Sequence, residues 1–168
     1  MEGKVQFSFA LIFLVLFSVW GGVRIYNSIT FDINCGDRLK RAADANTIEL
    51  AKQELKASLD YMEHEGMTSG YTSVLYNSPS EDIGFWYKNV KSSYDELLSL
   101  PDNVTPLERS NMLIKLRETL LDSGKESTKV TLPSGISIFP YNSFFAWWGY
   151  VSGILCCVFF IWWLKEND

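Results

Sequence analysis

His64 and the three cysteines are the side chains of this sequence best suited to catalysis or metal binding. His64 follows Asp60 by four residues in the segment DYMEHEG, so one helical turn would bring imidazole and carboxylate to the same face. A zinc site needs about four ligands, and no further ligand stands at a suitable spacing from this pair. We therefore interpret His64 as a solvated residue near the C-terminal end of a helix, where positive charge is favourable.

Cys35 and the acidic pair Glu81 and Asp82 give no stronger indication of catalysis. Cys35 lies in no recognisable nucleophile motif and is far in sequence from the single histidine. Glu81 and Asp82 fall in the expected first turn of a helix, where negative charge stabilises the helix dipole. The sequence predicts a protein that is not an enzyme and that holds no metal ion or cofactor.

Two apolar segments dominate the organisation of the chain. Residues 5–23 and 144–164 contain no charged side chain. At about 1.5 Å per residue, each forms a helix close to the roughly 30 Å thickness of a bilayer's hydrocarbon core. Helices of soluble proteins keep a polar face, which these segments lack. We predict a transmembrane helix at each, the first an uncleaved signal anchor, because Trp20 interrupts the small residues that cleavage requires.

Residues 24–143 lie between the two predicted spans and are numerous enough for one domain. Two spans place both termini on the same side. More basic residues flank the spans on the loop side than on the tail side, but long loops cross membranes largely regardless of charge. We favour an extracytoplasmic loop with cytoplasmic termini, and the opposite orientation stays open. The loop holds 13 Lys/Arg and 17 Asp/Glu, a net charge of −4, so we expect no nucleic-acid partner.

Three helices are expected in this loop, at about 37–65, 78–100 and 105–123. Ser78 and Thr105 are each followed by proline and then, at the third position, by glutamate, which is the pattern of a capping box. Apolar residues recur at helical spacing after each start. The expected buried positions are Ile48, Ala51, Leu55, Leu59 and Met62 in the first helix, Ile83, Trp86, Tyr87, Val90, Tyr94 and Leu97 in the second, and Leu107, Ile114, Leu120 and Leu121 in the third.

Short strands are predicted at 28–34 (SITFDIN), 71–76 (YTSVLY) and twice within 129–140 around a Pro-Ser-Gly turn. A ribbon between the first and last of these would bring the two spans together. Ordered linkers are the alternative, and for 28–34 a helix continuing out of the membrane also competes. The predicted fold is a mainly α membrane protein: two transmembrane helices flank a domain of about three helices with a small β ribbon.

The second apolar segment carries small residues on one face. Ala146, Gly149, Gly153 and Cys156 are spaced by three, four and three residues. Such a face lets two helix backbones approach closely in lipid. It either pairs with Ser18 and Gly22 of the first segment or contacts another copy or another membrane protein.

Four aromatic residues, Phe85, Trp86, Tyr87 and Tyr94, form a candidate docking or ligand patch in the loop. The alternative is core packing by Trp86 and Tyr87, with Phe85 left outward. Neither span contains an ionisable Asp, Glu, Lys, Arg or His, which argues against a transporter or proton pathway. We expect a membrane-anchored interaction or assembly module, a small non-catalytic subunit of an envelope complex or a self-associating membrane protein. A membrane-bound sensor whose loop binds a small ligand is the alternative.

Overall fold

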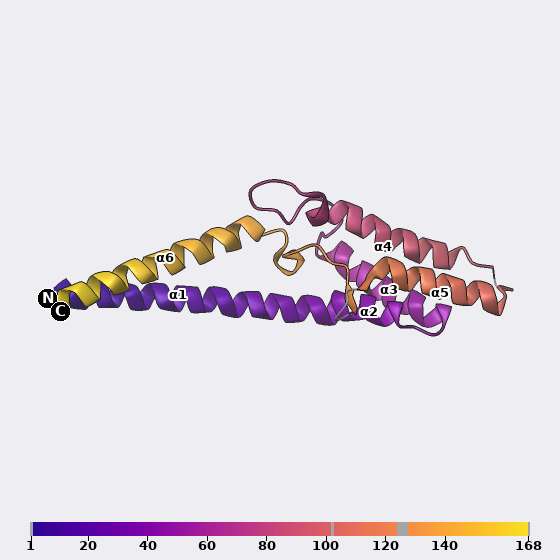
Figure 1. Ribbon diagram of the computed structural model, residues 1–168, viewed down its shortest axis with the longest axis horizontal. Coiled ribbons are helices and arrows are strands. Elements are labelled where there is room, and N and C mark those ends of the chain that lie inside the picture. The colour runs from indigo at the N-terminus through magenta and orange to yellow at the C-terminus, as the bar shows by residue number, and fades with distance from the viewer. Residues whose placement is uncertain (1, 102, 124–127, 168) are drawn as a thin grey trace.

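The computed structural model describes residues 2–101, 103–123 and 128–167 of an elongated, mostly helical chain. Helices α1 (Glu2–Phe31) and α6 (Asn142–Asn167) form one half of the molecule, and shorter elements form a domain at the other end (Figure 1). Both chain ends lie at the tip of the half remote from the domain. The mainly helical character expected from the sequence is confirmed.

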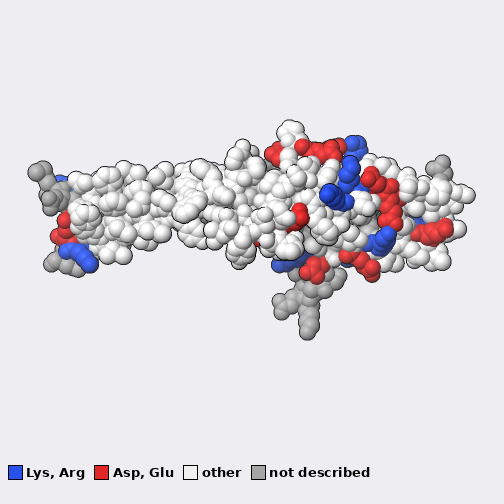
Figure 2. Space-filling model, turned by 90° about the horizontal axis from the view of Figure 1, so that it is seen from above, with Lys and Arg blue, Asp and Glu red and all other residues white. Residues whose placement is uncertain are grey.

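Both long helices are long and apolar enough to cross a membrane. The continuous helical segments that carry these stretches run over Lys4–Ala43 and Asn142–Glu166, and only 6% and 17% of their most apolar windows are buried. A core helix of a soluble domain would be largely covered. In Figure 2, charged side chains gather over the domain and at the end that holds the termini, and the surface between them carries none.

The first long helix continues into the domain without a break. After α1 the chain makes one π-helical turn, η1 (Asp32–Gly36), and then enters α2 (Asp37–Ala43). The strand predicted at 28–34 is therefore wrong, and the competing prediction of a helix leaving the apolar half is confirmed.

Burial explains why this segment is helical. Phe31, Cys35 and Leu39 are buried at spacings of four residues, which is the period of a helix face. Ile29 and Ile33, which suggested the alternation of a strand, are exposed. Packing against the domain therefore selects the helical stripe over the shorter alternating pattern.

Helix α3 (Ile48–His64) carries the stripe that the sequence predicted, and all five positions predicted for that stripe are buried. The expected single helix over 37–65 is wrong in one respect, because α2 ends at Ala43 and a turn separates it from α3. The side chain of Thr47 accepts a hydrogen bond from the backbone N–H of Leu50 at 3.2 Å and so begins a second helix.

Helix α4 (Ile83–Leu98) begins slightly later than the sequence indicated. Ser78 precedes a single 3-10 turn, η2 (Pro79–Glu81), and Asp82 caps α4 by accepting from the N–H of Phe85 at 2.9 Å. In α5 (Pro106–Leu120) the predicted capping box is confirmed, since Thr105 and Glu108 bond reciprocally.

The stripe predicted for α5 is partly wrong. Leu107 and Ile114 are 70% and 55% exposed, whereas Leu116 and Leu120 are buried. Helix α5 has apolar residues on more than one face, and its contacts with α2 and α4 select the face that carries Leu116 and Leu120.

The β ribbon consists of β1 (Leu121–Ser123) and β2 (Thr128–Val130), paired antiparallel with Leu121 opposite Val130. The second strand predicted within 129–140 is instead a 3-10 turn, η3 (Ile136–Ile138), and 71–76 contributes one bridge, Tyr71 to Asp82. The ribbon therefore follows α5 within the domain and does not join the two long helices.

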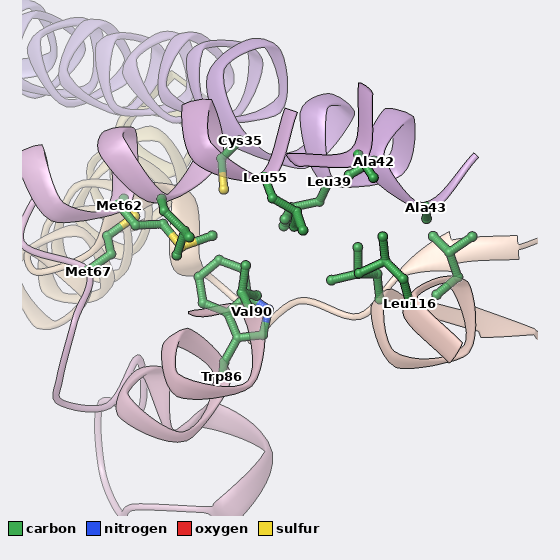
Figure 3. Close-up of a cluster of buried hydrophobic side chains, with 14 of the residues drawn as sticks. Cys35, Leu39, Ala42, Ala43, Leu55, Met62, Met67, Trp86, Val90 and Leu116 are labelled. Carbon is green, nitrogen blue, oxygen red and sulfur yellow. The ribbon is translucent and has the colours of Figure 1, made fainter. Parts of the chain in front are cut away.

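The domain core lies between the continuous helix, α3 and α4. In Figure 3, Cys35 points from that helix toward the side chains of Leu55, Met62, Trp86 and Val90. The core is thus built partly by the same helix that forms the apolar half of the molecule.

Candidate helix contact and interaction surfaces

The contact between α1 and α6 is built around Trp20. Its indole N–H donates to the backbone carbonyl of Phe145 at 2.7 Å. The indole ring lies directly against Gly149, where an added Cβ would stand 2.7 Å from two ring carbons. Atoms at that distance overlap, so only glycine admits the ring at this point of α6.

Three further residues of α6 extend this interface toward the chain ends. A Cβ on Gly153 would stand 3.3 Å from the ring of Phe17, and the Cys156 Sγ lies 3.6 Å from the carbonyl oxygen of Ala10. Phe159 stacks on Phe9 and Phe13, with centroids 5.1 and 5.8 Å apart. Rings of α1 therefore pack on the glycines of α6, and nearer the chain ends rings of both helices stack on each other.

The sequence-predicted residues divide between this interface and the free surface. Gly149, Gly153 and Cys156 lie at the contact, and Ala146 lines a groove of about 310 Å³ together with Trp20 and Arg24. Ser18 is exposed, and a Cβ on Gly22 would meet no atom within 4 Å. The small face of α6 therefore receives large rings of α1 instead of a second pair of small residues.

The aromatic residues of α4 lie in different environments. Trp86 is buried, and its indole N–H donates to the carbonyl of Thr131 at 2.9 Å, which joins α4 to the segment after β2. Tyr94 packs partly buried against the core, and Phe85 is exposed. The four residues therefore do not form one continuous patch.

Tyr87 joins α4 to α3. Its hydroxyl donates to a carboxylate oxygen of Glu63 at 2.6 Å, and the Lys91 ammonium lies 5.9 Å from the ring centroid. The hydrogen bond to Glu63 raises the pKa of Tyr87, and burial raises it further by a smaller amount. The polar end of this ring is thus engaged in holding the domain together.

His64 and Cys35 are far from forming a reactive pair. His64 is exposed in the last turn of α3 with Nδ1 2.9 Å from Glu65 Oε1, and Asp60 bonds Lys56 instead. Cys35 is fully buried in the core. Within the described ranges, no three His, Cys, Asp or Glu side chains gather into a group that could hold a metal ion.

Glu54 is a structural residue that the sequence reasoning missed. This buried carboxylate lies 2.6 Å from Arg41 and 3.3 Å from Arg38, which stand one helical turn apart in α2. The pair of arginines at that spacing was the only signal available in the sequence. The ion pairs fix α2 against α3 and close the junction between the long helix and the domain.

Trp20 is a second contact residue that the sequence did not predict, because the predicted contact of α1 consisted of the small residues Ser18 and Gly22. In the sequence, Trp20 stands one helical turn before the charged Arg24, and this spacing could have indicated a contact. In the structure the Arg24 guanidinium lies 5.2 Å from the centroid of the Trp20 ring.

Comparisons with protein-family models, curated proteins and solved structures found no match to this chain. The interpretation therefore depends on the geometry of the chain itself.

Proposed function

We propose that the chain is a membrane-anchored interaction module, a small non-catalytic subunit of a membrane complex. In this proposal α1 and α6 form a helical hairpin within the bilayer. The pairing of Phe7 with Trp163 and of Trp20 with Phe145 supports it, because it brings the uncharged stretches 5–23 and 144–164 into register. Both stretches then begin and end at the same two levels.

The observation that carries the interaction part of the proposal is a pair of exposed apolar residues on one face of α5. Leu107 and Ile114 stand seven residues apart on one helical face and remain exposed in a domain that buries leucines such as Leu39 and Leu55. A helix face of this kind docks into an apolar groove of another protein. The occupant that we propose is a different subunit of the same complex.

The predicted contact of α6 with another chain through its small face competes with this geometry. A partner helix seated on Gly149 would have to displace the ring of Trp20. We therefore assign the small face to closure of the hairpin and the partner contact to α5.

Photo-crosslinking in native membranes tests this assignment. A photoreactive residue at Leu107 or Ile114 is expected to give an adduct of defined mass with one other protein, and the same residue at the exposed Ser92 of α4 is not. Leu107→Lys with Ile114→Lys should abolish co-purification of that protein, while the control Ser92→Lys leaves it intact. An adduct of twice the chain's mass would indicate self-association, and adducts equal at all three positions would refute the docking face.

We further propose that the domain is extracytoplasmic, with both termini in the cytoplasm. Cys35 is too deeply buried to report on this, so a better probe is Ser92→Cys, at an exposed position of α4 outside the proposed docking face, in a chain whose Cys156 and Cys157 are replaced by alanine. A membrane-impermeant maleimide should label this variant in intact cells. Labelling only after permeabilisation would reverse the orientation.

One feature favours a sensor as a second candidate. The unbroken helix over Lys4–Ala43 joins the apolar half directly to the domain core. At its domain end, an open hollow of about 350 Å³ is lined by residues including Arg41, Asp44 and Asn46. A ligand held there would shift α2 and, through it, α1. Ligand-dependent stabilisation of the chain that Asn46→Trp abolishes would support this function.

A further inference from the structure

The loop between α3 and α4 presents three consecutive apolar residues to the outside. Leu75 and Tyr76 are 87% and 77% exposed, and Val74 beside them is also exposed. Between α3 and α5, the other large apolar residues that are more than half exposed are Phe85, Leu98, Leu107 and Ile114, and no two of them are adjacent in sequence. This tip is therefore the densest apolar projection of the described part of the domain.

The neck of the loop is fixed by hydrogen bonds. Tyr71 and Asp82 form an antiparallel bridge, and the N–H of Thr72 donates to the carbonyl of Glu81 at 3.0 Å. The Glu81 carboxylate accepts from the hydroxyls of Ser73 at 3.0 Å and Ser78 at 2.5 Å, one from each side of the neck. The tip is thus held out by its own base, and the fold does not draw it into the core.

The charged residues of the loop, Glu65, Glu81 and Asp82, lie at its two ends, and the stretch between them lacks charge. Residues 66–80 (GMTSGYTSVLYNSPS) contain no Asp, Glu, Lys, Arg or His, although the domain around them is rich in charged residues. A solvated loop has no need to exclude charge, whereas a loop that enters lipid does, because burying a charge in hydrocarbon costs several kcal/mol.

The loop also lies at the right level. In Figure 1 it reaches along the long axis of the molecule to the point where α6 begins. At its base, a Cβ on Gly70 would stand 3.4 Å from the ring of Phe139, in the segment that leads into α6. Exposed Tyr141 stands immediately before the start of that helix, a position typical of the aromatic belts of membrane interfaces.

We propose that the tip formed by Val74, Leu75 and Tyr76 inserts into the headgroup and upper acyl region of the leaflet next to the domain. The inference rests on the proposed anchoring of α1 and α6 in the bilayer. The tip then acts as a third, shallow membrane contact. It fixes the tilt of the domain on the long helix and orients the α5 face relative to the membrane plane.

Depth-dependent quenching tests the insertion. The full chain, with Cys156 and Cys157 replaced by alanine and buried Cys35 retained, is reconstituted into phosphatidylcholine nanodiscs. A polarity-sensitive fluorophore is attached at Leu75→Cys, at Ile154→Cys in the middle of α6, or at Leu107→Cys in the first turn of α5, a helix that lies on the side of the domain away from α6 (Figure 1). Lipids that carry a spin label either near the headgroup or near the bilayer centre then quench each fluorophore, and iodide quenches from water. Tyr76→Cys provides a second tip position should the Leu75 variant fail to fold.

The expected result separates the three positions. The tip label is quenched by the shallow spin label at least about threefold more than the Leu107 label, and it is protected from iodide. The Ile154 label responds mainly to the deep spin label.

If Ile154 is quenched by lipid but the tip behaves like Leu107, the insertion is refuted while the anchoring stands. If Ile154 is not quenched either, the anchoring fails and the insertion with it. A tip protected from iodide without quenching by lipid would mean that a protein covers it, which also overturns the proposal.

Discussion

Leu14 of α1 and Leu55 of α3 are both leucines of regular helices, yet Leu14 is 49% exposed and Leu55 is fully buried. The same contrast runs through the two halves of the molecule. The domain has a core of apolar side chains that exclude water, whereas α1 and α6 turn most of theirs outward. The two halves must therefore be held together by different forces.

In the domain, removal of apolar surface from water supplies the stability. Between α1 and α6 that drive is small if the surroundings are lipid, because acyl chains are as apolar as leucine. Close packing and interhelical hydrogen bonds remain, and the Trp20 contact provides both. Core volume should therefore govern the domain, and shape complementarity should govern the hairpin.

The largest difference between the halves is expected from leucine truncation. Leu55→Ala should lower the free energy of unfolding of the domain by about 2–5 kcal/mol, because it leaves a cavity in the core. Leu14→Ala should change it by less than about 0.5 kcal/mol. Urea titration of the chain in nanodiscs, followed by circular dichroism, measures both. Equal losses would mean that α1 packs like a core helix.

The next effect is expected at the helix contact. Gly149→Leu forces a side chain into the ring of Trp20 and should weaken packing of α1 on α6 by about 1–3 kcal/mol. Distances between spin labels at the exposed Tyr26 and Tyr141 should lengthen and broaden.

Gly22→Leu is the matched control for this substitution. It makes the same change in α1 at a position where a Cβ meets no atom within 4 Å. A control that separates the helices as strongly as Gly149→Leu would remove the proposed role of the ring.

A smaller effect is expected at the start of α5. Thr105→Ala removes the N-cap and should cost about 1 kcal/mol. The hydrogen bond from the Thr105 backbone N–H lowers the pKa of Glu108 below the ordinary value of 4.5, and the bond from the Thr105 hydroxyl lowers it further. A lowered carboxyl pKa stabilises the fold above that value, and the benefit is lost as pH falls through the lowered pKa.

The difference in stability between wild type and Thr105→Ala should therefore shrink when pH is reduced from 7 to about 3. The Ser110 hydroxyl donates to a backbone carbonyl of the same helix and not to a carboxylate. The stability difference between wild type and Ser110→Ala should therefore not change with pH. If the stability difference between wild type and Thr105→Ala stayed constant with pH, the charge of Glu108 would not contribute to the cap.

The smallest effect is expected from Trp20→Phe, which keeps the ring but removes the bond to the Phe145 carbonyl. Hydrogen bonds between membrane helices contribute about 0.6 kcal/mol on average. The spin-label distances should change slightly, and Trp147→Phe on the outward face of α6 should leave them unchanged. A Trp20→Phe effect as large as that of Gly149→Leu would mean that hydrogen bonding contributes as much as packing to the contact between α1 and α6.

Features that depend on residues close together in sequence were predicted correctly, and features that depend on distant contacts were not. The Thr105 cap and the α3 stripe depend on residues within one or two turns of each other, and both were correct. The 28–34 strand failed because its alternation spans only a few residues, and the burial of Phe31 and Cys35 against the domain overrides it. The α5 stripe failed because the helix offers more than one apolar face, and α2 and α4 decide which one is covered.

The sequence by itself determined that two uncharged helices of matched length flank a polar helical domain, since composition and helical period are properties of each segment alone. Tertiary structure decided that Trp20 lies on Gly149, that Glu54 closes the α2–α3 junction, and that the loop with exposed Leu75 reaches the level where α6 begins. Each of these depends on which distant residues arrive opposite one another, and that follows from the packing of the whole chain.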